Sequence, residues 1–101
     1  MDIDLDNGLI VQKNEQDTLI GQLHFTFLPG KKVLSIDQVF VDPQFRNQGW
    51  ARKILQASID LAQEKNYKIM PVCPYAKAVF KHEKALQILL ATPEVDHNEA
   101  K

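Results

Sequence analysis

Several residues that could hold an anion gather between Val41 and Lys53, in the segment VDPQFRNQGWARK. Arg46 and Arg52 carry positive charge around the point where a helical pattern begins, and Gly49 stands at that point. The first turn of a helix leaves backbone N–H groups unpaired and carries partial positive charge, so it binds phosphate readily. Gly49 has no Cβ, which lets backbone and ligand approach closely. The segment therefore suits a pyrophosphate; a cationic connector containing one glycine is the alternative.

Cys73 and Tyr75 are the side chains best suited to covalent or acid chemistry. Cys73 ends a short apolar strand and precedes Pro74, so it stands at a predicted helix start, a position where cysteines are often reactive. It could accept an acyl group or protonate a leaving sulfur, or it could pack as a small apolar side chain. Tyr75 could donate a proton or simply pack. Asp37, on an earlier strand, could relay a proton through water, or it could be an exposed strand charge.

Other polar and aromatic residues have weaker claims to a role. His24 alternates with Leu23 and Phe25, so we expect it on the opposite strand face, as a surface or second-layer residue; a general base is the alternative. His82 lies between two charged residues and is expected to be solvated. Trp50 could belong to the core or cover an adenine. The histidines and the single cysteine lie far apart without metal-ligand spacing, so we expect no metal site.

Three consecutive segments are predicted to be strands, at residues 8–14, 18–28 and 33–41. The second alternates polar and apolar residues, which indicates a strand with one buried face. The third is rich in β-branched residues and stops at Asp42-Pro43, since proline cannot donate to a sheet ladder. The links between the three are short, which favours an antiparallel meander.

The second half of the chain changes period. Apolar residues recur at three- and four-residue steps over residues 48–65, which predicts a helix. The apolar run 67–72 follows as a strand that could lie parallel to the preceding one, completing a β-α-β unit. A second helix is predicted at 74–83, with proline at its first position. The run 85–90 is apolar and could be helix or strand.

Length and composition predict one domain, at residues 1–91, with a polar tail at 92–101. A net charge of −1 gives no global case for binding nucleic acid. The acidic N-terminus lacks the plan of a signal peptide, and no apolar run approaches the roughly 20 residues of a membrane span. A single cysteine excludes an intrachain disulfide. We therefore expect a cytoplasmic protein, monomeric or weakly dimeric.

The hexapeptide RNQGWA resembles the acetyl-CoA signature of the GNAT acetyltransferases, Arg/Gln-x-x-Gly-x-Gly/Ala. In that superfamily the motif lies between a central strand and the next helix, and its backbone amides hold the CoA pyrophosphate. The resemblance implies an α/β (α+β) fold: a mixed sheet with an antiparallel meander, a β-α-β unit and a C-terminal helix. It also implies acetyl-CoA as cosubstrate. The motif residues that would bind it are Arg46, Asn47, Gln48, Gly49, Trp50 and Ala51.

A second stretch, KIMPVCPYAKAVFKH, resembles the I-x-P-x-C-x-[YF] segment of a short GNAT-like subgroup of roughly 100 residues. Together the two resemblances cover more than half of the chain, from Ile36 to about Leu90. Members of that subgroup often carry His-Thr where this chain has Gln38 and Val39. A proton-transfer role for that histidine could not be filled here from the same position.

The resemblance implies an N-acetyltransferase that moves acetyl from acetyl-CoA to an amine, either a protein lysine or a small amine. Backbone groups of Val39, Phe40 and Val41 would bind the pantetheine, and one N–H could polarise the thioester carbonyl. Cys73, Tyr75 and Asp37 are the candidate catalytic residues. Two alternatives remain: a non-catalytic acyl-CoA-binding module or sensor, and a small interaction domain that binds no nucleotide.

Overall fold

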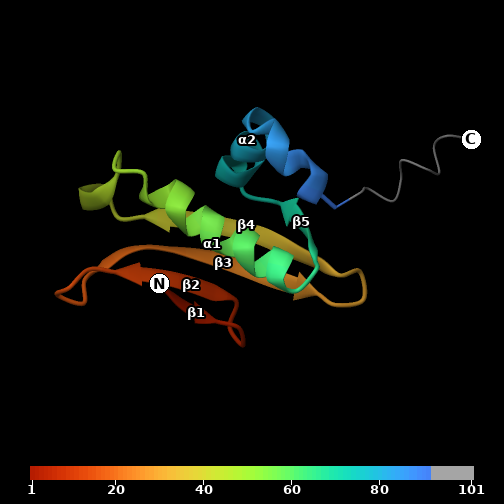
Figure 1. Ribbon diagram of the computed structural model, residues 1–101. Helices are drawn as coiled ribbons and strands as arrows, with labels where there is room; N and C mark the ends of the chain where they lie inside the picture. The colour runs from red at the N-terminus through yellow and green to blue at the C-terminus, as the bar shows by residue number, and fades with distance from the viewer. Residues whose placement is uncertain (92–101) are drawn as a thin grey trace, which may run out of the picture.

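The computed structural model describes residues 1–91, which form one five-stranded sheet with two α-helices (Figure 1). The strands are ordered β1-β2-β3-β4-β5 across the sheet. Neighbouring strands are antiparallel from β1 to β4, and β5 is parallel to β4. The strand bounds are Asp2–Asp4 for β1, Leu9–Lys13 for β2, Leu19–Leu28 for β3, Val33–Val41 for β4 and Lys68–Pro71 for β5.

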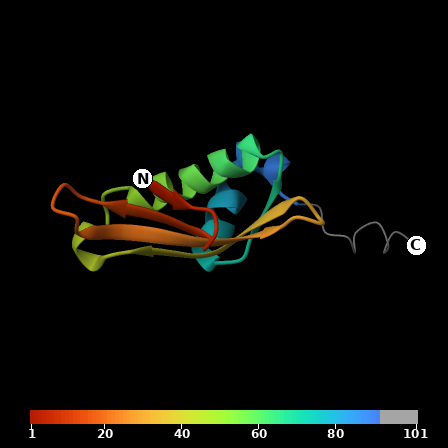
Figure 2. The ribbon, with the colours of Figure 1, turned by 90° about the horizontal axis from the view of Figure 1, so that it is seen from below.

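Helix α1 (Trp50–Glu64) connects β4 to β5 and lies along one face of the sheet (Figure 2). Its buried residues recur at three- and four-residue steps, from Ile54 through Ser58 to Ala62. They pack on the inner residues of β2, β3 and β4, such as Leu23 and Leu34. This packing fixes the start of α1 just beyond the end of β4.

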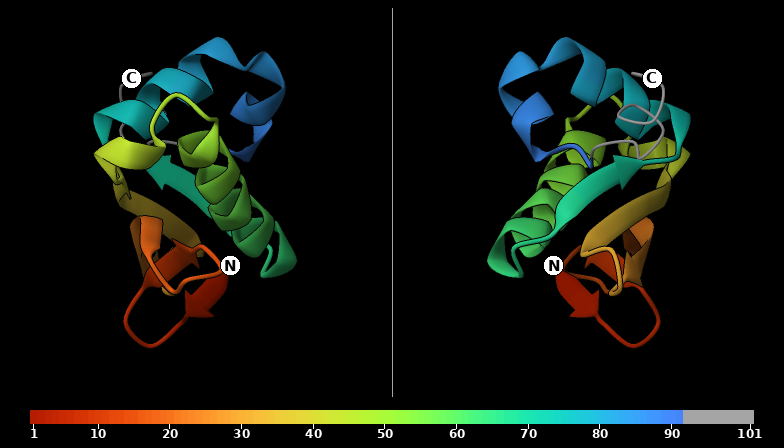
Figure 3. Two further views of the ribbon diagram at one scale, coloured as in Figure 1. Left: turned by 90° about the vertical axis from the view of Figure 1, so that its left-hand side faces the viewer. Right: turned by 90° about the vertical axis from the view of Figure 1, so that its right-hand side faces the viewer.

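Helix α2 (Pro74–His82) follows β5 and lies beyond that edge of the sheet, far from β1 (Figure 3). Ala76 and Phe80, one helical turn apart, are buried in the same core as α1. Two short 3₁₀ helices complete the described chain, Pro43–Phe45 after β4 and Lys84–Leu89 after α2. No helix within residues 1–91 is long and apolar enough to cross a membrane.

Two β-bulges shift the face on which side chains lie. Ile20 is an extra residue opposite Gln12 and Lys13, and Asp37 is an extra residue opposite His24 and Phe25. Simple alternation along the strand would place Ile20 on the same face as His24, opposite Leu23, but Ile20 is buried. A bulge inserts one residue without a partner, so the alternation changes phase there.

The predicted fold class is confirmed: an antiparallel meander leads into a β-α-β unit and a C-terminal helix. The prediction for β4 agrees residue for residue, and the 85–90 run is a 3₁₀ helix within its first five residues. β1 was missed, because its three residues are exposed and carry no apolar alternation. The predicted tail, 92–101, lies outside the described residues.

Candidate functional site

The loop between β4 and α1 is shaped by its own hydrogen bonds. Asp42 caps the 3₁₀ helix, because its Oδ1 accepts from the amide of Gln44 at 2.9 Å. The Nε of Arg46 donates to the carbonyl of Val41 at 2.9 Å, folding this exposed side chain back toward the end of β4. This bond does not use the two terminal nitrogens of the guanidinium, so they can donate to an anion.

The start of α1 has no side-chain cap. Gly49 occupies the N-cap position with φ +84°, in the left-handed region that favours glycine, and Asn47 has φ +64°. A Cβ built on Gly49 meets no atom within 4 Å, so this side of the helix start is open. The first turn of α1 also lacks acidic residues. Its first N–H groups therefore have no capping side chain, which leaves them available to an anion.

Two of the predicted cations near this turn have partners on the protein. Arg52 donates to both carboxylate oxygens of Glu83 at 2.8 Å, which ties α1 to the end of α2. Its charge is thus largely neutralised, which corrects our interpretation of Arg52 as part of the anion site. Lys53 lies over the ring of Trp50, with Nζ 4.7 Å from the ring centre. Trp50 itself is half-buried against the core and faces the β2–β3 turn.

One edge of β4 is left without a strand partner. β5 pairs with β4 only from Val33 to Ile36, and the amides of Val72 and Cys73 both donate to the carbonyl of Ile36. Asp37 is the bulged residue, and from Gln38 to Val41 β4 pairs with β3 alone. Backbone groups on the other edge of this segment, which holds Val39, Phe40 and Val41, are therefore available to a ligand.

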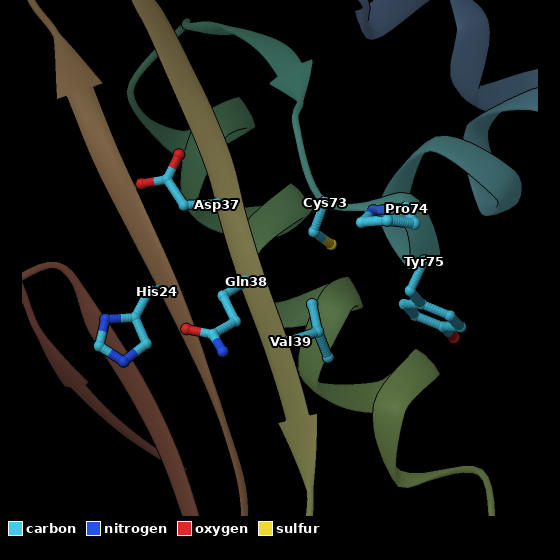
Figure 4. A pocket seen from close by; sticks show the side chains of 7 residues that line it. All are labelled: His24, Asp37, Gln38, Val39, Cys73, Pro74 and Tyr75. Atoms are coloured by element: carbon cyan, nitrogen blue, oxygen red, sulfur yellow. The ribbon is translucent and has the colours of Figure 1, made fainter.

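A pocket of about 560 Å³ opens where β4 and β5 part (Figure 4). It is lined from three elements: β3, β4, and the start of α2 with the residue before it. Its lining residues are His24, Asp37, Gln38, Val39, Cys73, Pro74 and Tyr75. The pocket thus contains all three predicted catalytic residues. It also contains a histidine that the sequence argument had assigned to a surface or second-layer position.

Cys73 is the N-cap of α2 and lies on the wall of the pocket. Its Sγ accepts a hydrogen bond from the amide of Ala76 at 3.3 Å, and only 7% of the residue is exposed. The predicted position at a helix start is confirmed. The thiol both caps the helix and lines the pocket. Cys73 can therefore be a packed side chain and still reach a ligand in the pocket.

Tyr75 lies in the first turn of α2, half-buried at the rim of the pocket. Burial raises the pKa of Tyr75, while the nearby charge of Arg52 acts in the opposite direction. A phenol with a raised pKa keeps its proton at neutral pH. Tyr75 can therefore donate a hydrogen bond or a proton to a group in the pocket.

Asp37 reaches the pocket because it is the bulged residue of β4. Its two carboxylate oxygens accept hydrogen bonds from the hydroxyls of Thr26, at 2.6 Å, and Ser35. The bulge turns both Asp37 and its neighbour Gln38 toward the pocket (Figure 4), although simple alternation along a strand would place two neighbouring residues on opposite faces. The result is a fixed negative charge on the wall of the pocket.

His24 lines the pocket, although sequence reasoning favoured a surface position for it over a role as general base. Its cross-strand partner in the sheet is Gln38, and its Nε2 lies 3.4 Å from Nε2 of Gln22. The outer face of β3 at this point is a wall of the pocket, because α1 covers only the other face. Strand alternation gave the correct face for His24, and only the packing of the helices showed what lies there.

The described part of the chain contains no cluster of side chains that could bind a metal ion. Within residues 1–91, no three side chains of His, Cys, Asp or Glu come close enough together to hold an ion. The groups gathered at the site are a backbone edge, an open helix start, a thiol, a phenol, a carboxylate and an imidazole. This arrangement can bind an extended ligand that has an anionic end and a reactive centre.

A family model of the GCN5-related N-acetyl-transferases matches residues 10–89. The chain belongs to this family. It is therefore an acetyltransferase, and the resemblance in the 46–51 loop is confirmed at the level of the family. The match covers both the loop at the start of α1 and the pocket between β4 and α2, so these features lie within the family domain.

Solved structures agree with this assignment of the GNAT fold. A GCN5-like protein from Staphylococcus aureus superposes with a TM-score of 0.69 at 22% identity, over 91% of this chain and 89% of its own. A GNAT family protein from the same species is 31% identical, with a TM-score of 0.55 over 60% of this chain and 51% of its own. No curated protein sequence matches the chain.

A third structure is a GNAT family N-acetyltransferase from Escherichia coli in complex with CoA. It has 22% identity and a TM-score of 0.56, and the match covers 62% of this chain and 38% of its own. The last two matches thus span about half or less of the larger proteins. The first structure, in contrast, has nearly the same extent as this GNAT domain.

Proposed function

We propose that this GNAT domain transfers the acetyl group of acetyl-CoA to an amine. The observation that carries the proposal is the unpaired edge of β4 from Asp37 to Val41. It runs from the pocket that holds Cys73 and Tyr75 to the loop that starts α1. An extended ligand lying along this edge would have its anionic end at the helix start and its reactive end in the pocket.

The loop of residues 46–51 is proposed to bind the pyrophosphate of CoA. The uncapped first turn of α1 offers N–H donors and a partial positive charge. Gly49 leaves open space on the ligand side, and Arg46 adds a cation that its bond to Val41 already orients. The other loop residues, Asn47, Gln48, Trp50 and Ala51, would contribute mainly through their backbone.

The pantetheine arm is proposed to add to the sheet beside β4, in place of the strand that β5 no longer provides. Backbone groups of Val39, Phe40 and Val41 would pair with its amides, as a β-strand would. One N–H on this edge would polarise the thioester carbonyl. The E. coli relative solved with CoA supports CoA as the ligand of the shared fold.

The chemistry then needs proton transfers but no metal. The neutral amine attacks the thioester carbon, the C–N bond forms, and the C–S bond breaks. Tyr75 keeps its proton at neutral pH and is proposed to donate it to the leaving thiolate of CoA. Cys73 is proposed to lie against the thioester sulfur, where its thiol could assist the same step. Asp37 is proposed to attract the acceptor, because its carboxylate favours a cationic amine.

The test is a parallel titration with acetyl-CoA, CoA and ATP, followed by a transfer assay. The proposal expects acetyl-CoA and CoA to bind and ATP to bind much more weakly, since ATP lacks pantetheine. It also expects release of free CoA in the presence of a lysine peptide or a small primary amine. Binding without release would favour the non-catalytic module, and no binding would favour the interaction domain.

A further inference from the structure

His24 stands on the opposite side of the pocket from Tyr75, with β4 between them (Figure 4). The ring and the amide of Gln38 point toward one another across the β3–β4 pair. His24 is half-buried in the sheet, and its side chain is accessible from the pocket. An acceptor that reaches the thioester over Gln38 and Val39 would pass beside this imidazole.

The other polar groups of the pocket are poorly suited to take a proton from an amine. Both oxygens of Asp37 already accept hydroxyl hydrogen bonds, and a carboxylate is a much weaker base than an imidazole. Tyr75 has a raised pKa and remains protonated at neutral pH. The Sγ of Cys73 is engaged with the amide of Ala76 and is nearly buried. Histidine is the side chain that exchanges protons near neutral pH.

We propose that His24 is the general base of acetyl transfer. The nitrogen of the acceptor amine forms a bond to the thioester carbon, and its extra proton passes to the imidazole of His24. The C–S bond breaks, and the leaving thiolate takes a proton from Tyr75. His24 then returns its proton to solvent and Tyr75 regains one, so the cycle closes without an oxidant or metal. This role rests on the proposed function, because it needs an amine acceptor.

The surroundings of His24 support both protonation states of the ring. Gln22, 3.4 Å away, has an amide with both donor and acceptor, so it can face a neutral imidazole or an imidazolium. On the β2 side the cross-strand neighbour is Leu9, whose own partner on β1 is Asp4. The imidazolium therefore has an apolar neighbour on that side.

On the β4 side the groups that face His24 are Gln38, its direct partner, and the carboxylate of Asp37 one residue before. The thiol of Cys73 and the phenol of Tyr75 face it from the start of α2. Among these groups Asp37 is the carboxylate, and its hydrogen bonds with the hydroxyls of Thr26 and Ser35 hold it in place. The expected pH dependence includes this carboxylate as well as the imidazole.

The experiment compares His24→Gln with the matched substitution His82→Gln, at an exposed position at the end of α2. Acetyl transfer to a primary amine is followed as kcat/KM from pH 6 to pH 9. His24→Gln should lower kcat/KM about 100-fold at pH 7.5 and change the shape of its pH profile. His82→Gln should match the wild type. Acetyl-CoA affinity and the thermal midpoint should be the same in both variants.

A second variant, His24→Ala, should be partly rescued by added imidazole, which a purely structural defect would not be. If the wild type transfers acetyl and His24→Gln keeps its rate and pH profile, the role of His24 is wrong while the proposed function stands. If the wild type binds acetyl-CoA but acetylates no amine, the proposed function fails, and the role of His24 fails with it. These two results are therefore distinguishable.

Discussion

The two α-helices of this GNAT domain begin in contrasting ways. α1 starts at Gly49, which has a left-handed backbone, no capping side chain and open space beside it. α2 starts at Cys73, whose Sγ accepts from the amide of Ala76, with proline at the next position. A helix start that caps itself is complete, while one left uncapped keeps donors for a ligand. We interpret the first as the place for a phosphate and the second as a wall of the reaction pocket.

The largest expected effect is at the uncapped start. Gly49→Val should abolish acetyl-CoA binding, at least 100-fold in Kd, because a β-branched residue at φ +84° is strained and obstructs the approach to the first turn. Isothermal titration gives the affinity. Gly30→Val is the control, since a Cβ at Gly30 also meets no atom within 4 Å but needs no left-handed backbone.

Both glycine variants should be checked by thermal unfolding, because strain at Gly49 also lowers stability by about 1–3 kcal/mol. A folded Gly49→Val protein that binds acetyl-CoA normally would remove the basis for the phosphate site. Equal loss of affinity in both variants would point to a general defect rather than to the start of α1.

The next effect is at the capped start, where Tyr75→Phe removes a proton donor without changing the cap. We expect kcat to fall about 100-fold with little change in acetyl-CoA affinity. Burial raises the pKa of Tyr75, so the protonated form stays favoured up to and beyond its ordinary value of 10.0. Rates measured up to that pH should show no loss from Tyr75 ionisation. A Phe variant with normal kcat would exclude the phenol as the acid.

Arg46 tests whether the uncapped start acts together with its loop. Arg46→Ala should weaken acetyl-CoA binding by about 1–3 kcal/mol, the range for losing a charge-assisted hydrogen bond. Arg46→Lys keeps the positive charge but loses the hydrogen bond from Nε to the carbonyl of Val41. Its affinity for acetyl-CoA should therefore fall between those of the wild type and the Ala variant. Titration with acetyl-CoA at two salt concentrations separates the contribution of the positive charge from that of the hydrogen bond to Val41. If the Lys variant binds as weakly as the Ala variant, Arg46 acts through the geometry of the loop.

A smaller effect is expected where the helices are joined. Hydrogen bonds from Arg52 lower the pKa of Glu83 below its ordinary value of 4.5. A lowered carboxylate pKa adds stability above that ordinary value, and the gain is lost as pH falls through the folded-state pKa. Glu83→Gln should therefore lower the thermal midpoint slightly at pH 7, by a few degrees at most, because the pair is partly exposed.

As pH falls below 4.5 the wild type and Glu83→Gln should approach each other in stability, since the advantage of the lowered pKa of Glu83 is lost as pH falls through the folded-state pKa. A difference that stays constant from pH 7 to pH 3 would show that the glutamine acts through packing. Acetyl-CoA affinity should be unchanged at pH 7, since Arg52 is assigned to α2 rather than to the phosphate.

The smallest effect on stability is expected for Cys73→Ser. A serine hydroxyl can still accept from the amide of Ala76, so the free energy of unfolding should change by less than about 1 kcal/mol. Cys73→Ala loses the cap and should cost about 1 kcal/mol. If the thiol assists chemistry, both variants lose acetyl transfer while acetyl-CoA affinity holds. Normal transfer by the Ser variant would leave Cys73 with the capping role alone.

Local pattern was sufficient for most of the fold. β4 and the helix start at Pro74 could be located from the sequence, because β-branched alternation and proline at a first helical turn act within a few residues. The change to three- and four-residue steps at Gln48 likewise located the start of α1 to within two residues. β1 could not be found this way, since its three exposed residues are a strand only by pairing with β2.

The arrangement of the site depended on tertiary structure. Three contacts between residues far apart in the chain build the site. They are the β3–β4 bulge that turns Asp37 to the pocket, the pairing of His24 with Gln38, and the ion pair of Arg52 with Glu83. Residue type and spacing along the chain do not predict such contacts. The sequence by itself determined strands β2 to β5, the two α-helices and the signature loop, because these follow from short-range sterics and periodicity. Tertiary structure decided which side chains share one pocket, because register and helix packing decide which faces meet.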